Sequence, residues 1–252
     1  MLKDKYSVLN RNSKTLNRQK VFYLNCLKIG IMNPILDYYN ALAGNYDTNR
    51  FGNSYGQFID RQERQVLDRL VKRDETIIDL ACGSGRLLNY ATFGVDGSSE
   101  MVRIAKGKFP DKEIYLSDAG TLPFANASVD TIITFHFFMH LDEAKISNIL
   151  AECHRVLRPG GRVIFDIPSK KRRWLFNYKS SDWHGATGFS FKEIDEITNG
   201  RFEVKRTFGL MFFPIHRFPN GLRRFLGRAD AFIANSFLKE YSSYLVLECI
   251  RL

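Results

Sequence analysis

One segment, residues 76–88, constrains the fold of this chain more than any other and has the sequence TIIDLACGSGRLL. A short β-branched run ends at Asp79, passes through Gly83 and Gly85, and continues into residues that favour a helix. This order predicts a strand, a tight turn and a helix, and the glycines of the turn let a ligand lie against the backbone. The first amides of the helix are unpaired at such a turn and suit a polar ligand.

The residues after this turn exclude two common nucleotide-binding loops. A dinucleotide-binding loop has a third glycine three residues after the second, and Leu88 stands at that position. A phosphate-binding loop ends in Gly-Lys-Ser or Gly-Lys-Thr, and the turn does not continue in that way. The ligand is therefore expected to be of another kind.

Acidic residues end the next two predicted strands. Residues 94–98 predict a second strand that ends at Asp96, and residues 114–119 predict a third that ends at Asp118. A carboxylate at the end of a second parallel strand can accept hydrogen bonds from both hydroxyls of a ribose. Asp118 can accept from an adenine amino group while the amide of Ala119 meets a ring nitrogen. Residues 129–135 and 155–166 predict two more strands.

In this order and spacing, the motifs resemble those of class I S-adenosylmethionine-dependent methyltransferases, the group that includes ubiquinone/menaquinone-type and small-molecule methyltransferases. The matching motifs, all within residues 40–170, are Asp79-x-Ala81-x-Gly83-x-Gly85, Val95-Asp96-x-Ser98-x-x-Met101, Asp118-Ala119-x-x-Leu122-Pro123-Phe124 and Arg155-Val156-Leu157-Arg158-Pro159-Gly160-Gly161. The resemblance implies S-adenosyl-L-methionine as methyl donor and S-adenosyl-L-homocysteine as product. It also implies an α/β fold: a Rossmann-like, seven-stranded, mostly parallel sheet with helices on both faces.

The resemblance further implies a cofactor site drawn from this whole region. In relatives, the segment equivalent to residues 46–50 lies over the methionine end of the cofactor, and an arginine can pair with its carboxylate through two hydrogen bonds. An ordinary surface turn is the alternative for this segment. The expected cofactor residues are Tyr46, Arg50, Asp79, Ala81, Gly83, Gly85, Asp96, Met101, Asp118, Ala119 and Phe135.

The sequence departs from the family pattern in two places. Only nine residues separate Gly85 from Val95, which predicts a short first helix or a clipped second strand. Arg86 stands where the family often has a small residue. Neither change removes a group expected to contact the cofactor, so cofactor binding is expected to survive.

Three histidines are candidate general bases, because imidazole titrates near neutral pH. His136 and His140 follow the fourth predicted strand, and His184 lies in an aromatic-rich segment after the fifth. A packed, hydrogen-bonded histidine is the alternative for the first two. The methyl group on a positively charged sulfur is already activated, so the protein mainly aligns the reactants and excludes water. An amine, thiol or activated carbon acceptor would need a base less than a hydroxyl does.

Composition limits the class of protein further. The four cysteines are scattered without a C-x-x-C pair, which argues against a disulfide framework or a metal centre and favours a cytoplasmic setting. Apolar runs stay well short of the ~20 residues needed to span a bilayer. The net charge of +10 also suits nucleic acid. However, the residues after the fourth strand, TFHF, do not match the aromatic-flanked tetrapeptide of base methyltransferases.

The chain is expected to have three parts. Residues 1–33 are basic and lack a periodic apolar face, so we expect a disordered or untranslated extension before a methyltransferase domain at 34–252. Residues 211–243 are expected to form a helical insertion between strands six and seven that covers the substrate. Its apolar stripe, within residues 222–237, lies beside arginines and can also pair subunits or meet an anionic membrane. The plainer alternative is a helix packed on its own domain.

The sequence therefore predicts methyl transfer from S-adenosylmethionine to a small-molecule, lipid, quinone or glycan-type acceptor by in-line displacement. The predicted setting is the cytoplasm, with peripheral membrane contact as a further expectation. The main alternative is a cofactor-binding or regulatory member of the fold without turnover, and a nucleic-acid methyltransferase is less favoured. The acceptor atom and the oligomeric state do not follow from the sequence.

Overall fold

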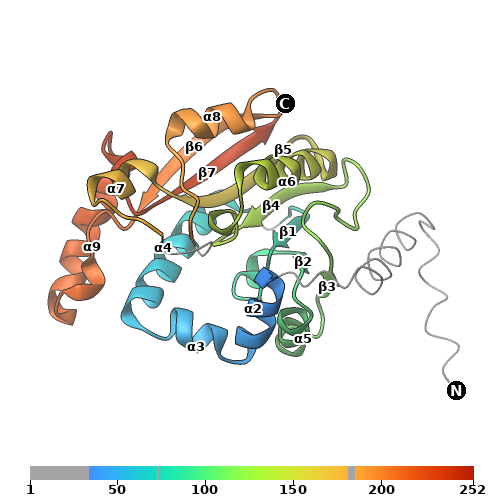
Figure 1. Cartoon of the computed structure of the whole chain (residues 1–252), viewed down its shortest axis with the longest axis horizontal. Helices are drawn as coiled ribbons and strands as arrows, with labels where there is room; N and C mark the ends of the chain where they lie inside the picture. The colour runs from blue at the N-terminus through green and yellow to red at the C-terminus, as the bar shows by residue number, and fades with distance from the viewer. Residues whose placement is uncertain (1–33, 73, 181–184) are drawn as a thin grey trace, which may run out of the picture.

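A seven-stranded sheet with the strand order β3-β2-β1-β4-β5-β7-β6 forms the centre of the protein (Figure 1). The computed structural model describes residues 34–72, 74–180 and 185–252, so the expected extension at 1–33 lies outside the described residues. The strands are β1 Ile77–Leu80, β2 Phe93–Asp96, β3 Glu113–Leu116, β4 Val129–Thr134, β5 Leu157–Pro168, β6 Phe202–Leu210 and β7 Tyr244–Arg251.

The strand directions confirm the predicted mostly parallel sheet. Strands β1 to β5 pair in parallel, whereas β7 runs antiparallel to both β5 and β6. Tyr244, the first residue of β7, is opposite Pro168 on one side and Leu210 on the other. The last residues of β5 and β6 therefore lie at the same edge of the sheet, the edge at which ligands of doubly wound sheets bind.

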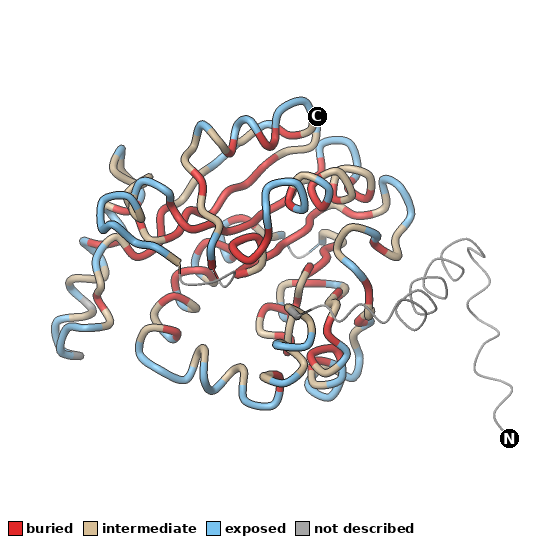
Figure 2. Tube along the Cα trace, in the orientation of Figure 1, coloured by how far each residue is buried: buried red, intermediate tan, exposed pale blue. Residues whose placement is uncertain are grey.

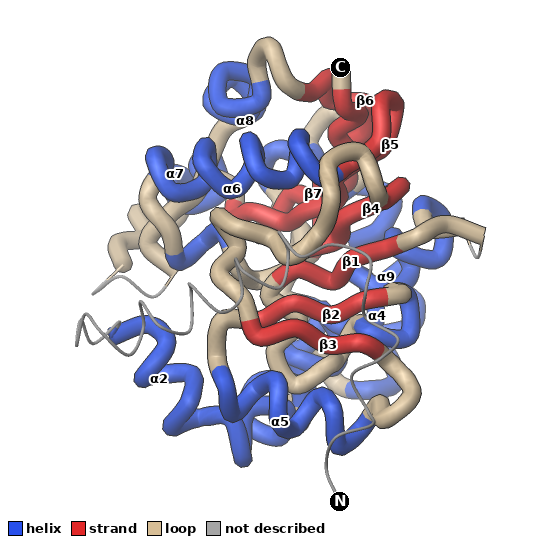
Figure 3. The backbone as a smooth tube through the Cα atoms, turned by 90° about the vertical axis from the view of Figure 1, so that its right-hand side faces the viewer, coloured by secondary structure: helices blue, strands red, loops and turns tan. Residues whose placement is uncertain are grey.

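Helices cover both faces of the sheet. Figure 3 shows α6, α7 and α8 on one face and α4 and α9 on the other. Strand residues are largely buried between these layers, as Figure 2 shows. The helices are α2 Pro34–Leu42, α3 Tyr46–Phe51, α4 Ser54–Leu70, α5 Ser99–Lys108, α6 Glu143–Val156, α7 Lys170–Leu175, α8 Phe191–Thr198 and α9 Asn220–Ala234.

Local sequence signals explain how several helices begin. The side chain of Ser98 accepts a hydrogen bond from the Met101 amide and caps α5. Ser190 and Glu193 form a capping box at the start of α8. The short first helix is also confirmed, because only a single 3₁₀ turn, Leu88–Tyr90, separates the glycine turn from β2.

The insertion between β6 and β7 is helical as predicted, but it is anchored by polar groups. Buried Asp230 of α9 accepts a hydrogen bond from Gln62 of α4 at 3.0 Å and another from the Phe213 amide at 2.6 Å. This anchor turns the apolar stripe outward, so that Phe225 is 73% exposed and Phe232 is 79% exposed. The helix itself contacts β6, as the alternative of a helix packed on its own domain predicts, but Phe225 and Phe232 of its apolar stripe stay exposed.

Among the residues that the structure describes, no helix is both long and apolar enough to cross a membrane.

Candidate active site

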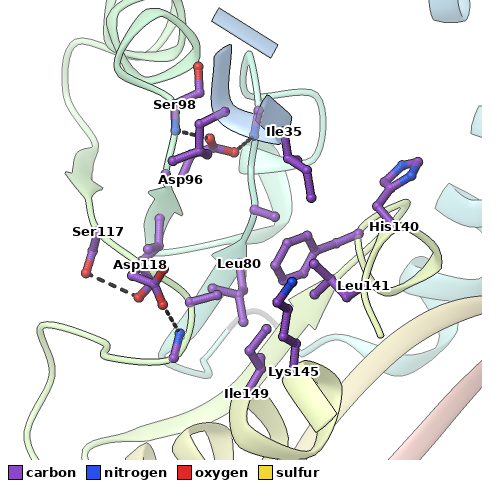
Figure 4. A pocket seen from close by; sticks show the side chains of 18 of the residues that line it. Ile35, Leu80, Asp96, Ser98, Ser117, Asp118, His140, Leu141, Lys145 and Ile149 are labelled. Carbon is purple, nitrogen blue, oxygen red and sulfur yellow. Dashed lines mark hydrogen bonds between the residues drawn. The ribbon is translucent and has the colours of Figure 1, made fainter. Parts of the chain in front are cut away.

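A cavity of about 730 Å³ opens at the carboxyl ends of β1 to β4. Figure 4 shows side chains from several elements pointing into it, with Asp96 and Asp118 on one side and His140 and Lys145 on the other. The expected cofactor residues that line it are Tyr46, Ala81, Gly83, Asp96, Met101, Asp118, Ala119 and Phe135. The structure therefore brings together residues from most of the motifs in the first half of the chain.

The glycine turn after β1 depends on left-handed backbone conformations. Ala81 has a φ of 57°, Gly83 of 54° and Gly85 of 94°. A Cβ atom at Gly85 would lie 3.0 Å from the side chains of Leu88 and Phe109, whereas one at Gly83 would meet no atom within 4 Å. Gly85 is thus needed for the shape of the turn and does not line the cavity, while Gly83 does.

Asp96 is positioned by the backbone at the end of β2. One carboxylate oxygen accepts a hydrogen bond from the Gly83 amide and the other accepts from the Ser98 amide, each at 2.8 Å. Burial raises the pKa of Asp96 above its usual value. Because each carboxylate oxygen keeps further lone pairs, Asp96 can still accept from two neighbouring hydroxyls of a ribose.

Asp79 is buried within β1 and does not line the cavity. Its Oδ2 atom has no hydrogen-bond partner among the described residues. Burial raises the pKa of Asp79 to about 7, although Arg86 acts in the opposite direction. A nearby positive charge would favour the ionised form of this carboxyl. The residues therefore fit a cofactor that brings a sulfonium and an ammonium group to the adjoining cavity.

Helices α2 and α3 are tied to the glycine turn and to the start of α5. The Ser84 hydroxyl donates to Asp47 at 2.5 Å, and Lys108 pairs with the same carboxylate. Asn40 of α2 and the Ser98 hydroxyl lie 2.6 Å apart. The segment at 46–50 is therefore a helix fixed beside the turn and not an ordinary surface turn. Sequence reasoning missed these partners, because Ser84 occupies a variable position of its motif.

A smaller pocket of about 270 Å³ adjoins the cavity. Tyr39, Tyr46 and His140 line both spaces, whereas Arg50 lines only the smaller one. Burial raises the pKa of both Tyr39 and Tyr46, so these phenols stay neutral at physiological pH. The full lining of the smaller pocket is Tyr38, Tyr39, Leu42, Tyr46, Asn49, Arg50 and His140.

His136, an expected general base, lies in a buried cluster of charged side chains. Its Nε2 atom is 2.7 Å from a Glu63 carboxylate oxygen, and its Nδ1 atom is 3.6 Å from one of Asp166. Its backbone amide also donates to Asp166 at 2.6 Å. Both ring nitrogens therefore face carboxylates, and His136 also lines the cavity, so its role as a general base stays a prediction. No local sequence pattern indicates these partners, because Glu63 and Asp166 lie on α4 and β5, far from His136 in the chain.

Arg86 completes this cluster, and its guanidinium lies 2.8 Å from Glu63 and 2.6 Å from Asp60. Burial by itself would raise the pKa of Glu63, but His136 and Arg86 hold it below its usual value. Burial raises the pKa of Asp166 to about 6, against the effect of His136. Ligand atoms of Glu63, His136 and Asp166 lie within 4.8 Å of one another, a spacing that a metal ion could use. Arg86 already supplies positive charge there.

His140 lies between the two pockets, and its Nδ1 atom accepts a hydrogen bond from the Gly185 amide at 3.0 Å. A neutral imidazole that accepts at Nδ1 carries its proton on Nε2. In this arrangement Nε2 of His140 is a hydrogen-bond donor, which does not match the expected role of proton acceptor. His184, the third expected base, lies outside the described residues.

Comparison with known proteins agrees with the fold and the cavity. Residues 78–165 match a family model described as a methyltransferase domain. The chain is 30% identical over 241 residues to an uncharacterized protein of Methanocaldococcus jannaschii, an alignment that covers 84% of this chain and 88% of the relative. It is 32% identical over 166 residues to a demethylmenaquinone methyltransferase of Thermotoga maritima, with 61% and 72% covered.

A solved structure shows the same fold at lower sequence identity. It is an S-adenosylmethionine-dependent methyltransferase of Thermotoga maritima, described as a possible histamine N-methyltransferase. The TM-score is 0.64 at 18% identity, and the match covers 84% of this chain and 97% of the other. Together with the sheet order and the strand-end carboxylates, these matches show that the chain belongs to the class I S-adenosylmethionine-dependent methyltransferases.

Proposed function

We propose that this methyltransferase transfers the methyl group of S-adenosylmethionine to an apolar small molecule by in-line displacement. The observation that carries the proposal is the pair of adjoining pockets with Tyr39, Tyr46 and His140 on their common border. The larger space has the strand-end carboxylates that suit the cofactor, and the smaller has largely aromatic walls. Cofactor and acceptor would then meet at the shared residues, where a reactive approach needs close alignment.

The proposed roles of the cofactor residues follow from their surroundings. Asp96 accepts from the ribose hydroxyls, and Asp118, held by the Gly120 amide at 2.7 Å, accepts from the adenine amino group. Tyr46 lines both spaces and holds the methionine end, whereas Arg50 lines only the smaller space and faces the acceptor. The sulfonium supplies the reactivity of the methyl group when the cofactor is bound, so these residues position it and exclude water.

We propose that the acceptor atom is nucleophilic enough to attack the methyl group without a strong base from the protein to remove a proton first. Both nitrogens of His136 face carboxylates, Nδ1 of His140 already accepts a backbone hydrogen bond, and burial raises the pKa of Tyr39. An electron-rich ring carbon of a quinol or phenol meets this requirement: it attacks the methyl carbon as the bond to sulfur breaks, S-adenosylhomocysteine leaves, and the ring carbon then releases its proton to water. The Thermotoga maritima relative, a demethylmenaquinone methyltransferase, supports this acceptor class. The Nε2–H of His140 is proposed to donate to an oxygen of the acceptor.

The acceptor class can be tested with methyl-labelled S-adenosylmethionine and the purified full chain. We expect label to enter demethylated quinols or phenols that partition into an organic phase, and not RNA or protein. His140→Ala should lower this transfer by about 100-fold at saturating cofactor, the lower end of the range for loss of a positioned donor. Labelling of RNA or protein in place of apolar acceptors would overturn the proposal. Failure to label any apolar acceptor by protein that binds the cofactor would do the same.

Cofactor affinity is expected to rise with pH between about pH 5.5 and 7.5, because Asp79 has a pKa of about 7 in the free protein. The positive charges of the cofactor favour ionised Asp79, so binding releases a proton below that pKa. If the bound cofactor lowers the pKa by one unit, the dissociation constant falls by up to about tenfold over this range. Calorimetric titration at several pH values measures the effect.

Asp79→Asn removes the titrating group and should flatten this pH profile. Asp166, whose pKa burial raises to about 6, is the neighbouring group that titrates in the same range, so Asp166→Asn serves as the matched comparison. An unchanged slope in Asp79→Asn protein would show that another group releases the proton.

A further inference from the structure

Exposed apolar side chains are concentrated in two segments of this protein. Twelve large apolar side chains are exposed among the described residues, and ten of them lie within residues 174–178 and 213–237. Trp174 is 79% exposed, and Phe237 is 90% exposed. We call residues 170–179 and 211–243 together the basic aromatic surface. Contiguous exposed apolar side chains of this kind mark interaction sites more often than isolated ones do.

Both segments leave the sheet at one place. Pro168 precedes α7, Leu210 precedes the insertion, and both residues are opposite Tyr244 at the carboxyl edge of the sheet. Figure 1 shows α7 and α9 at that edge, and Figure 3 shows them on opposite faces. Arg172 of α7 joins the two parts, because its guanidinium lies 4.4 Å from the ring centroid of Phe176 and 5.9 Å from that of Phe212.

The same two segments are strongly basic. Residues 170–179 and 211–243 contain ten lysines and arginines but only two acidic residues, Asp230 and Glu240. Both acidic side chains are engaged within the protein, since Asp230 is buried against Gln62 and Glu240 pairs with Lys171. The exposed aromatic rings are therefore surrounded by positive charge, with Arg217 and Arg228 exposed on the insertion.

We propose that the basic aromatic surface binds a membrane that exposes anionic lipid headgroups. Trp and Phe side chains enter the region between headgroups and acyl chains, while Lys and Arg are attracted to the negative surface. This inference rests on the proposed function for one point only, the source of the acceptor. An apolar acceptor dissolved in the membrane would then reach the enzyme at the edge of the sheet that carries the active site.

The charge of this surface disfavours two other occupants. In a symmetric dimer the same patch meets itself, so the basic segments of two copies would face each other and repel. The segment at residues 1–33 contains seven lysines and arginines against one aspartate, so it is not complementary either. A partner with an anionic surface and an apolar interior can pair with the basic residues and also bury the aromatic side chains.

Co-sedimentation of the full chain with vesicles tests this proposal. One set of vesicles is phosphatidylcholine, and the other contains about 30% phosphatidylserine, so that only the second has a negative surface. We expect binding to the second set that weakens with added salt. Arg217→Glu with Arg228→Glu should reduce partitioning into the anionic vesicles at least about 30-fold. Each arginine near a negative membrane surface contributes to the free energy of binding, and each glutamate is repelled. Trp174→Gln with Phe225→Gln and Phe232→Gln should also abolish binding.

The matched control makes the same charge change elsewhere: Arg69→Glu with Lys106→Glu, two exposed residues on α4 and α5. It should retain binding within about threefold, since these residues lie outside the surface. Cofactor affinity, measured for every variant, shows that the fold is intact. Equal loss in the control, failure of the wild type to bind anionic vesicles, preferential binding to RNA, or dimerisation that the aromatic changes abolish would overturn the proposal. Vesicle binding without methyl transfer to apolar acceptors would overturn only the proposed function.

Discussion

Arg86→Met is expected to lower the free energy of unfolding by about 3–5 kcal/mol, the range for breaking a buried ion pair by removing one partner. The Arg86 side chain is 13% exposed, lies within 3 Å of carboxylate oxygens of Asp60 and Glu63, and stacks on Phe51 at 4.4 Å. Methionine has a similar volume but leaves the fully buried Glu63 carboxylate with the His136 imidazole as its remaining close partner among the described residues. Urea unfolding of both proteins measures the difference.

The control for this prediction is Arg103→Met, which breaks the exposed pair with Glu100 at 2.9 Å. Its cost should stay below about 1 kcal/mol, because solvent screens exposed ion pairs. A similar small loss for Arg86→Met would show that the buried cluster relaxes or that water enters to solvate Glu63.

Asp96→Ala is expected to weaken cofactor binding by at least about tenfold, and by up to about 20,000-fold if both ribose hydrogen bonds are lost. Hydrogen bonds to a charged acceptor contribute about 1.5–3 kcal/mol each, and 1.4 kcal/mol corresponds to a factor of ten in affinity. The change also removes the acceptor for the Gly83 and Ser98 amides, so the glycine turn loses support. Calorimetric titration with S-adenosylmethionine measures the loss.

Asp130→Ala separates this effect from a general loss of stability. Asp130 lies near the amino end of β4, where it accepts from the Thr76 amide at 2.8 Å and pairs with Arg158. Its replacement should lower stability while cofactor affinity stays within about twofold, because it lies at the opposite edge of the sheet from the cavity. Unchanged affinity in Asp96→Ala protein would remove Asp96 from the cofactor site.

The sequence predicted the elements that depend on local patterns. Residues 76–88 indicated the strand and glycine turn, and the short spacing from Gly85 to Val95 indicated a short first helix. These predictions succeeded because a strand and a tight turn each depend on neighbouring residues, whose spacing is visible in the chain. The order of the motifs further indicated the sheet, since acidic strand ends of parallel strands gather at one edge.

The sequence was a poorer guide to the general base than to the fold, and the cluster around His136 shows why. A histidine after a strand is a reasonable base by position, but its protonation and hydrogen bonds depend on residues that lie elsewhere in the chain. Glu63 is 73 residues before His136 and Asp166 is 30 residues after it, yet the fold places both beside the imidazole. The partner of His140, the Gly185 amide, is likewise distant in sequence.

The insertion shows the same division between sequence and tertiary structure. Periodicity alone determined that residues near 222–237 form an amphipathic helix, because an apolar stripe repeats with the helical period. Which side of that helix faces the protein was decided by tertiary contacts, since a buried Asp230 bonded to Gln62 fixes its rotation and leaves Phe225 and Phe232 exposed. The sequence by itself thus determined the elements, the motif order and the family, while only the tertiary structure decided which charges are buried together and which apolar face meets the solvent. The physical reason is that local patterns set backbone conformation, whereas burial and pairing depend on contacts between distant segments.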